Sequence, residues 1–139
     1  MTPGKVSVII PFAQEHPQVA FTVQSIYCEL RDQVDFEIIC IDNHCDELQA
    51  QLMAKGLIRD KGGEYLSKLA NYERPWLKYI TYDTKLSHWN AKNSGVRIST
   101  GEFLWFCDSH CVPSVGALVK MIKYYQRHWE ELNGTLHMP

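Results

Sequence analysis

The residues best suited to chemistry are Asp108 and His110, which directly follow the most hydrophobic stretch of the chain, residues 103–107. In an extended segment, residues two apart point the same way, so this carboxylate and this imidazole can converge on one point. An oxygen and an imidazole nitrogen together suit Mn²⁺, Mg²⁺ or Zn²⁺. Such a cation would neutralise a leaving diphosphate. In the plainer alternative, Asp108 caps a turn before Pro113 and His110 is a surface residue.

Two further polar residues stand near expected strand ends. Asp42 ends an apolar run, where its carboxylate can accept a hydrogen bond from a ring N–H of a base or from a ribose hydroxyl. Alternatively, Asp42 and Asn43 simply form a turn. Lys92 lies on a short helix before the strand that leads to Asp108 and His110, and it could pair with a phosphate oxygen. The alternative is a solvated lysine on a helix face. The neighbouring Gly95 is a poor helix former, for which close backbone packing is one explanation.

The cysteines bear on both metal binding and compartment. The zinc-ligating residue types in this part of the sequence are His44, Cys45, Cys107, His110 and Cys111, and together they could form a zinc site. Structural zinc sites present their ligands in tight pairs, a pattern that these residues lack. The chain has five cysteines, an odd number, and two of them lie in apolar runs. This usage indicates a reducing compartment, and we expect a cytoplasmic protein.

The elements that must position these residues alternate between strands and helices. Strands are predicted at residues 6–10, 36–41, 76–82 and 102–107. Helices are predicted at 17–31, twice within 46–71, and at 88–98. A last helix is predicted to be capped by Ser114, with Leu118, Val119, Ile122, Tyr125 and Trp129 on its buried side. The tail from residue 134 resembles the start of another strand.

This alternation predicts an α/β fold. Near-continuously apolar strands separated by helices indicate a Rossmann-like, mostly parallel sheet with helices on both faces. Such sheets bind ligands outside the carboxyl ends of their strands. The strand ends at residues 11–15, 42–46 and 108–111 are all rich in polar or unusual residues. We therefore expect the site at this edge.

Size and composition exclude several classes of protein. The chain has 139 residues, 45% of them hydrophobic and 22% charged, which fits one globular domain. A net charge of −2 gives no electrostatic footprint for nucleic acid or for an anionic membrane. No apolar run approaches the ~20 residues needed to cross a bilayer. The first residues lack the pattern of a signal peptide.

The order and spacing of several segments resemble the GT-A nucleotide-sugar glycosyltransferases, in particular the large family-two group. The matching segments are residues 6–12, 37–43, 91–96 and 100–102. The run from Asp108 to Cys111, with Val115, Gly116 and Leu118, is similar to polypeptide N-acetylgalactosaminyltransferases, in which an Asp-x-His pair binds Mn²⁺. The resemblance covers about residues 5–125.

The resemblance implies a metal-dependent glycosyltransferase that moves a sugar from a nucleotide-diphosphate donor, expected to be a UDP-sugar, to an unknown acceptor. The implied cofactor is Mn²⁺ or Mg²⁺. The implied nucleotide-sugar-binding residues are Pro11, Phe12, Glu15, Asp42, Lys92 and Asp108. The implied metal ligands are Asp108 and His110. The family more often has arginine where this chain has Lys92, and a second acidic residue where it has Asn43.

The resemblance also implies what this chain lacks. The acceptor half of the family, with its catalytic base, would lie beyond Pro139. We therefore expect a single nucleotide-sugar-binding domain over residues 1–139, truncated before that half and exposing an apolar sheet edge that favours a homo-oligomer. A non-catalytic nucleotide-sugar-binding fragment is one alternative. A nucleotidyltransferase is another, disfavoured because residues 12–16 are not a glycine- and lysine-rich loop.

Overall fold

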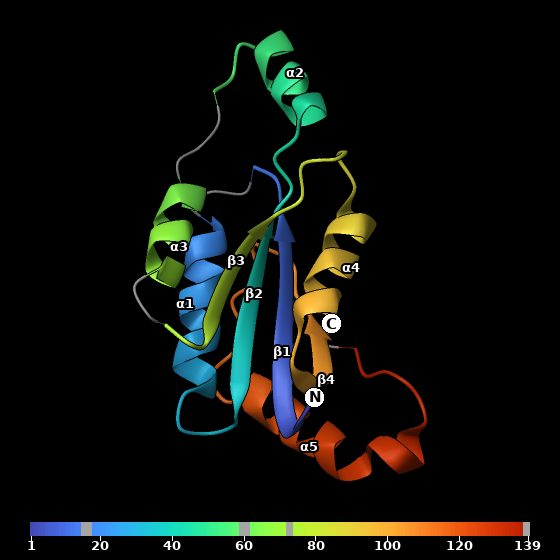
Figure 1. Ribbon diagram of the computed structural model, residues 1–139. Helices are drawn as coiled ribbons and strands as arrows, with labels where there is room; N and C mark the ends of the chain where they lie inside the picture. Colours follow the sequence, from blue (N-terminus) through green and yellow to red (C-terminus); the bar gives the residue numbers. More distant parts are fainter. Residues whose placement is uncertain (15–17, 59–61, 72–73, 138–139) are drawn as a thin grey trace.

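A computed structural model describes residues 1–14, 18–58, 62–71 and 74–137 (Figure 1). Strands and helices alternate through most of the chain, as predicted, and the segment 46–71 holds two helices. The elements are β1 (Thr2–Phe12), α1 (Gln18–Leu30), β2 (Phe36–Asp42), α2 (Asp46–Ala54), α3 (Gly62–Asn71), β3 (Leu77–Thr81), α4 (His88–Ile98), β4 (Gly101–Phe106) and α5 (Ala117–Leu132). The α/β prediction is confirmed.

The strands form one parallel sheet in the order β3-β2-β1-β4. β1 is central, and its residues 6–12 are buried whichever face they point to. A strand covered on both sides cannot alternate apolar with polar residues, which explains its continuous apolar run. All carboxyl ends meet at one edge of the sheet, where the predicted site residues Pro11, Phe12, Asp42, Asp108 and His110 lie.

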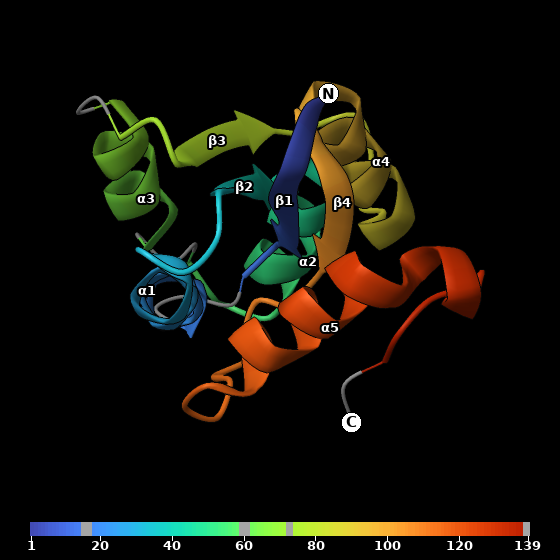
Figure 2. The ribbon, with the colours of Figure 1, turned by 90° about the horizontal axis from the view of Figure 1, so that it is seen from below.

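Helices cover the two faces of the sheet unequally (Figure 2). On one face, α1 and α5 pack with Val8, Ile10 and Cys40 into the larger core. The buried residues of α1 recur at helical spacing: Val19, Thr22, Val23, Ile26 and Leu30. On the other face, α4 packs mainly against β1 and β2. This second layer positions one wall of the site.

Close packing explains the poor helix formers of α4. Gly95 faces the sheet and is buried. A Cβ atom there would lie 2.7 Å from Cδ1 of Ile41 and 3.1 Å from Cγ2 of Ile9. Ala91, one turn earlier, is also fully buried against the same residues. Small side chains at these two positions therefore set the distance between α4 and the strands.

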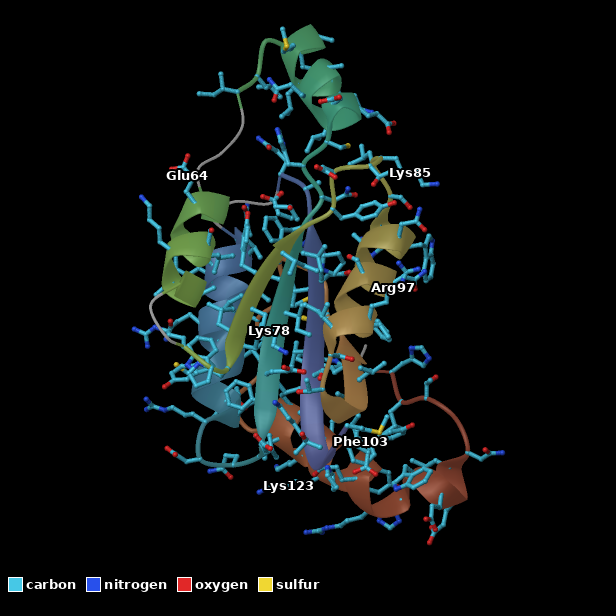
Figure 3. The ribbon with its side chains drawn as sticks, in the orientation of Figure 1. Glu64, Lys78, Lys85, Arg97, Phe103 and Lys123 are labelled. Carbon is cyan, nitrogen blue, oxygen red and sulfur yellow. The ribbon has the colours of Figure 1, made fainter. Side chains whose placement is uncertain are left out.

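A buried carboxylate joins the strands at their amino ends. Oε1 of Glu37 accepts hydrogen bonds from the hydroxyl of Ser7 (2.6 Å) and the backbone N–H of Thr100 (2.6 Å), and Oε2 pairs with Nζ of Lys78 at 2.7 Å. Lys78 extends over the sheet from β3 (Figure 3). Burial raises the pKa of Glu37, but the bonds from Lys78, Ser7 and Thr100 outweigh it and lower the pKa to about 2.

The prediction for the last helix was partly wrong. The residue that caps α5 is Gly116, in the left-handed conformation (φ 76°), and Ser114 contributes its carbonyl rather than its side chain. A glycine adopts this conformation without strain, so the chain turns there and the helix begins later. Leu118 and Ile122 are buried as predicted, but Trp129 is 44% exposed. Residues 133–137 form no strand.

β4 is less covered than its apolar sequence predicted. Trp105 and Phe103 pack into the larger core, whereas Leu104 and Phe106 on the other face are 42% and 47% exposed. The reason is that α4 covers β1 and β2 instead. Self-association through this edge stays a prediction. Across the described residues, no helix is both long and apolar enough to cross a membrane.

Candidate functional site

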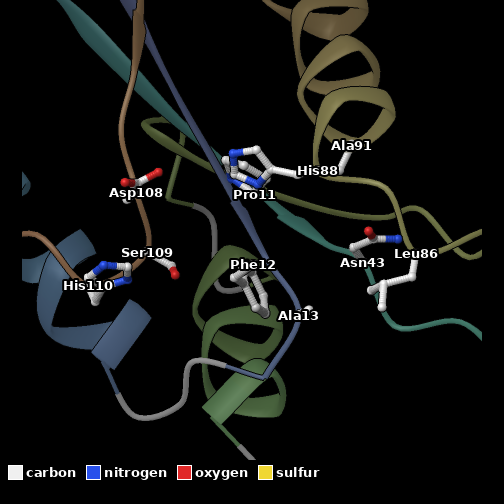
Figure 4. Close-up of a pocket in the computed structure, with 10 residues that line it drawn as sticks. All are labelled: Pro11, Phe12, Ala13, Asn43, Leu86, His88, Ala91, Asp108, Ser109 and His110. Carbon is white, nitrogen blue, oxygen red and sulfur yellow. The ribbon is translucent and has the colours of Figure 1, made fainter. Parts of the chain in front are cut away.

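A pocket of about 290 Å³ opens at the carboxyl ends of β1 and β4, beside the first turn of α4 (Figure 4). It lies at the edge where parallel sheets bind ligands. Its lining residues come from β1, the loops after β2, β3 and β4, and the start of α4. They are Pro11, Phe12, Ala13, Asn43, Leu86, His88, Ala91, Asp108, Ser109 and His110.

Asp108 and His110 both line this pocket. They are exposed, whereas Ser109 between them is 3% exposed and its carbonyl accepts a hydrogen bond of 2.8 Å from the hydroxyl of Thr22 on α1. At the start of the loop, the backbone N–H of Cys107 bonds the carbonyl of Ile9 at 3.1 Å. Because the intervening residue is fixed inward, its two neighbours are presented outward.

Pro11 and Phe12, at the end of β1, form the floor of the pocket, between the loop after β4 and the start of α4. Phe12 is 3% exposed, and its ring packs at 6.2 Å from the ring of Tyr79 on β3. Four of the seven residues predicted from the sequence therefore meet at one pocket. Glu15, which was predicted beside them, lies outside the described residues.

Asp42 lies at the same edge of the sheet but does not line the pocket. It is 1% exposed. One carboxylate oxygen accepts a hydrogen bond from the hydroxyl of Tyr79, and the other accepts one of 3.1 Å from the backbone N–H of His44. Its predicted hydrogen bond to the base of the nucleotide stays a prediction.

Asn43, treated in the sequence as a turn residue, organises one wall. Its Nδ2 donates hydrogen bonds of 2.8 Å to the carbonyls of Tyr82 and Lys85, and its Oδ1 accepts one of 2.8 Å from the backbone N–H of Ser87. Asn43 itself is 3% exposed, and the three bonds are partly buried. An aspartate has no N–H and cannot make the first two. These two bonds therefore require an amide at position 43, where the family that the sequence resembles more often has an acidic residue.

Lys92 is held away from the pocket lining. Its Nζ lies 5.2 Å from the ring centroid of Trp89 and 5.8 Å from that of Phe106, both within cation–π range. The basic residue of α4 that does line the pocket is His88, one turn earlier. Its spacing of four residues from Lys92 was the available signal, and sequence reasoning missed it.

The cysteines are thiols that do not form a metal site. Burial raises the pKa of Cys40 to about 12. Burial, and then the neighbouring Cys111, raise the pKa of Cys107 as well. In the part of the chain that the structure describes, no three His, Cys, Asp or Glu side chains come together as metal ligands. The zinc site assembled from the sequence is therefore not found there.

Comparison with known proteins gives a family and a fold. A family model described as Glycosyl transferase family 2 matches residues 7–135. No curated protein matches the sequence. Among solved structures, S. aureus TarS residues 1–349 has 19% identity and a TM-score of 0.67, covering 90% of this chain and 33% of that one. The same protein in complex with UDP gives the same values.

A second fold neighbour is the mannosyltransferase PcManGT from Pyrobaculum calidifontis, solved in complex with GDP-Man and Mn²⁺. It has 19% identity and a TM-score of 0.66, and the match covers 86% of this chain and 32% of that one. The chain thus spans about a third of the length of these solved structures. The shared architecture confirms the predicted GT-A fold.

Proposed function

The chain belongs to glycosyl transferase family 2, and from that premise we propose that it binds a nucleotide-diphosphate sugar, with UDP as the nucleotide, for transfer of the sugar to an acceptor. The observation that carries the proposal is the convergence of Asp108, His110, Pro11 and Phe12 on one pocket at the carboxyl edge of the sheet. This is where a nucleotide binds in an open parallel sheet.

The side chains that line the pocket include two that can ligate a divalent cation. Asp108 offers a hard oxygen and His110 an imidazole nitrogen, a combination that suits Mn²⁺ or Mg²⁺. No third His, Cys, Asp or Glu side chain joins them among the described residues. That count suits a cation that keeps several waters and binds substrate phosphates. When bound, the cation would supply charge neutralisation for the departing nucleoside diphosphate.

The other residues of the chain would orient the donor. Pro11 and Phe12 form an apolar floor against which the nucleoside can pack, and we keep Glu15 as a proposed neighbour. Asp42 would accept a hydrogen bond from the base. Because both its oxygens already accept one hydrogen bond, the base must share an oxygen with Tyr79 or His44. Lys92 would contribute positive charge near the diphosphate.

We propose that residues 1–139 supply the donor-binding half of the enzyme and that the catalytic base lies elsewhere. The share of the solved structures that the chain covers supports this assignment. Binding without turnover is the alternative. Free thiols at Cys28, Cys40, Cys45, Cys107 and Cys111 support a reducing compartment, and we place the protein in the cytoplasm.

Calorimetric titration of the chain with UDP and with GDP, each with and without Mn²⁺, tests the proposal. We expect heat from UDP in the presence of Mn²⁺ and much less without it. No heat from either nucleotide would contradict the donor site. Hydrolysis of a UDP-sugar by the chain would then separate the two alternatives, because a fragment that only binds releases no sugar.

A further inference from the structure

We propose that His88 is a donor-binding residue that hydrogen-bonds the diphosphate from the wall opposite Asp108 and His110. The inference rests on the proposed function and adds a phosphate contact that the sequence did not indicate. Its first support is position: His88 comes from the start of α4, Asp108 and His110 come from the loop after β4, and all three line the same pocket (Figure 4).

The second support is what the basic residues of α4 contact. The ammonium of Lys92 lies over the rings of Trp89 and Phe106, and Lys92 does not line the pocket. His88 is exposed at the pocket wall one turn closer to the amino end of the helix, where its ring lies edge-on to the ring of Trp89, with centroids 6.4 Å apart. Imidazole carries at least one N–H in either protonation state, so it can donate to a phosphate oxygen.

The third support is that the first turn of α4 is fixed. The Ser87 hydroxyl caps the helix by accepting the backbone N–H of Asn90 at 3.3 Å. Asn43 binds the backbone N–H of Ser87 at 2.8 Å. Farther along the helix, Ala91 is fully buried against the sheet. The backbone that carries His88 is therefore held in place beside the pocket, as a ligand contact requires.

The arrangement places nitrogen donors and metal ligands on opposite walls. A diphosphate bound to a cation at Asp108 and His110 would keep oxygens that can accept a hydrogen bond from the side of α4. The wall there is otherwise formed by Leu86 and Ala91, whose side chains donate no hydrogen bond, and by Asn43, whose amide N–H groups already bond the carbonyls of Tyr82 and Lys85. His88 would therefore supply a side-chain hydrogen-bond donor for the phosphates on that wall, and we expect no comparable contact with the nucleoside.

The test compares UDP with uridine, both in Mn²⁺, on the chain and on His88→Ala. We expect H88A to lower the affinity for UDP about tenfold, the effect of losing one hydrogen bond to a charged group, and to leave the affinity for uridine unchanged. His88→Asn, whose amide still donates, should lose less. His128→Ala on α5, far from the pocket, is the matched histidine control. Thermal unfolding of each variant checks that the chain is folded.

The outcomes separate this inference from the proposed function. If the unaltered chain binds neither UDP nor GDP, the proposed function fails and the inference fails with it. If the chain binds UDP and H88A binds it equally well, the inference alone is overturned. An equal loss of affinity for UDP and for uridine would also overturn it, because uridine has no phosphate and the loss of a phosphate contact cannot weaken its binding.

Discussion

The side-chain oxygen of Asn43 accepts a hydrogen bond of 2.8 Å from the backbone N–H of Ser87, a residue 44 positions away in sequence. Asn43 directly follows β2, and Ser87 directly precedes α4. The end of a central strand thus fixes the beginning of the helix that forms one wall of the pocket. The same amide holds the carbonyls of Tyr82 and Lys85 in the connecting loop.

Asn43→Asp should destabilise the chain because it removes both N–H donors and sets a carboxylate against the carbonyls of Tyr82 and Lys85. We expect the free energy of unfolding to fall by about 2–4 kcal/mol, measured by urea denaturation. Asn93→Asp, the same change at an exposed position of α4, is the control. Equal stability of both variants would show that the Asn43 bonds are not required.

Asp108→Asn should abolish most of the Mn²⁺ dependence of UDP binding, because an amide is a weaker ligand than a carboxylate. We expect at least about a tenfold loss of Mn²⁺-dependent affinity by calorimetry, and a similar loss for His110→Ala. Asp83→Asn, at an exposed position after β3, is the control. Unchanged titrations of D108N would remove Asp108 from the metal site.

Glu37→Gln should change how stability depends on pH. The folded protein holds the pKa of Glu37 at about 2, below its ordinary 4.5. The unfolded chain therefore binds this proton first, and the stabilisation by the carboxylate is present at neutral pH and lost as the pH falls from about 5 toward 2.

We expect E37Q to be about 2 kcal/mol less stable at pH 7, since Lys78 is a third exposed and the ion pair is partly solvated. The gap to the unaltered chain should shrink by pH 3, as read from denaturant unfolding at several pH values. Glu64→Gln, at an exposed position on α3, is the control. A gap that stays constant with pH would contradict the assignment.

Gly101→Ala should destabilise the start of β4. An added Cβ would lie 2.6 Å from Oγ of Ser7 and 2.8 Å from the carbonyl oxygen of Lys5, and that backbone atom cannot move cheaply. We expect a loss of about 1–3 kcal/mol by thermal or urea unfolding. Gly134→Ala meets an atom only at 3.5 Å and should have little effect. Similar stability of both variants would indicate that β4 shifts freely.

The sequence predicted the fold well because the relevant signals are local. The apolar run of β1 and the helical spacing in α1 each fall within one element, and their neighbours follow from parallel topology. α4 was predicted at residues 88–98 and begins and ends there, since Ser87 caps it and the chain extends again at Ser99. The sheet edge that holds the pocket followed from the same reasoning.

The missed features depend on contacts between distant segments. Asn43 and Ser87 meet only once β2 and α4 are packed, and no spacing rule connects them. Lys92 has favourable local spacing, but its ammonium is attracted to Phe106 at the end of another strand. Ser114 has the side chain of a helix cap, yet the glycine two residues later begins α5 instead.

The Glu37 network and the pocket occupy opposite ends of the same strands. Glu37 is the second residue of β2 and Asp42 its last, and Gly101 begins β4 whereas Asp108 follows it. We therefore expect substitutions at the amino ends that raise or lower the melting temperature to leave the pocket unchanged. The stability of this domain could thus be adjusted at one end of the sheet without altering the side chains that line the pocket at the other.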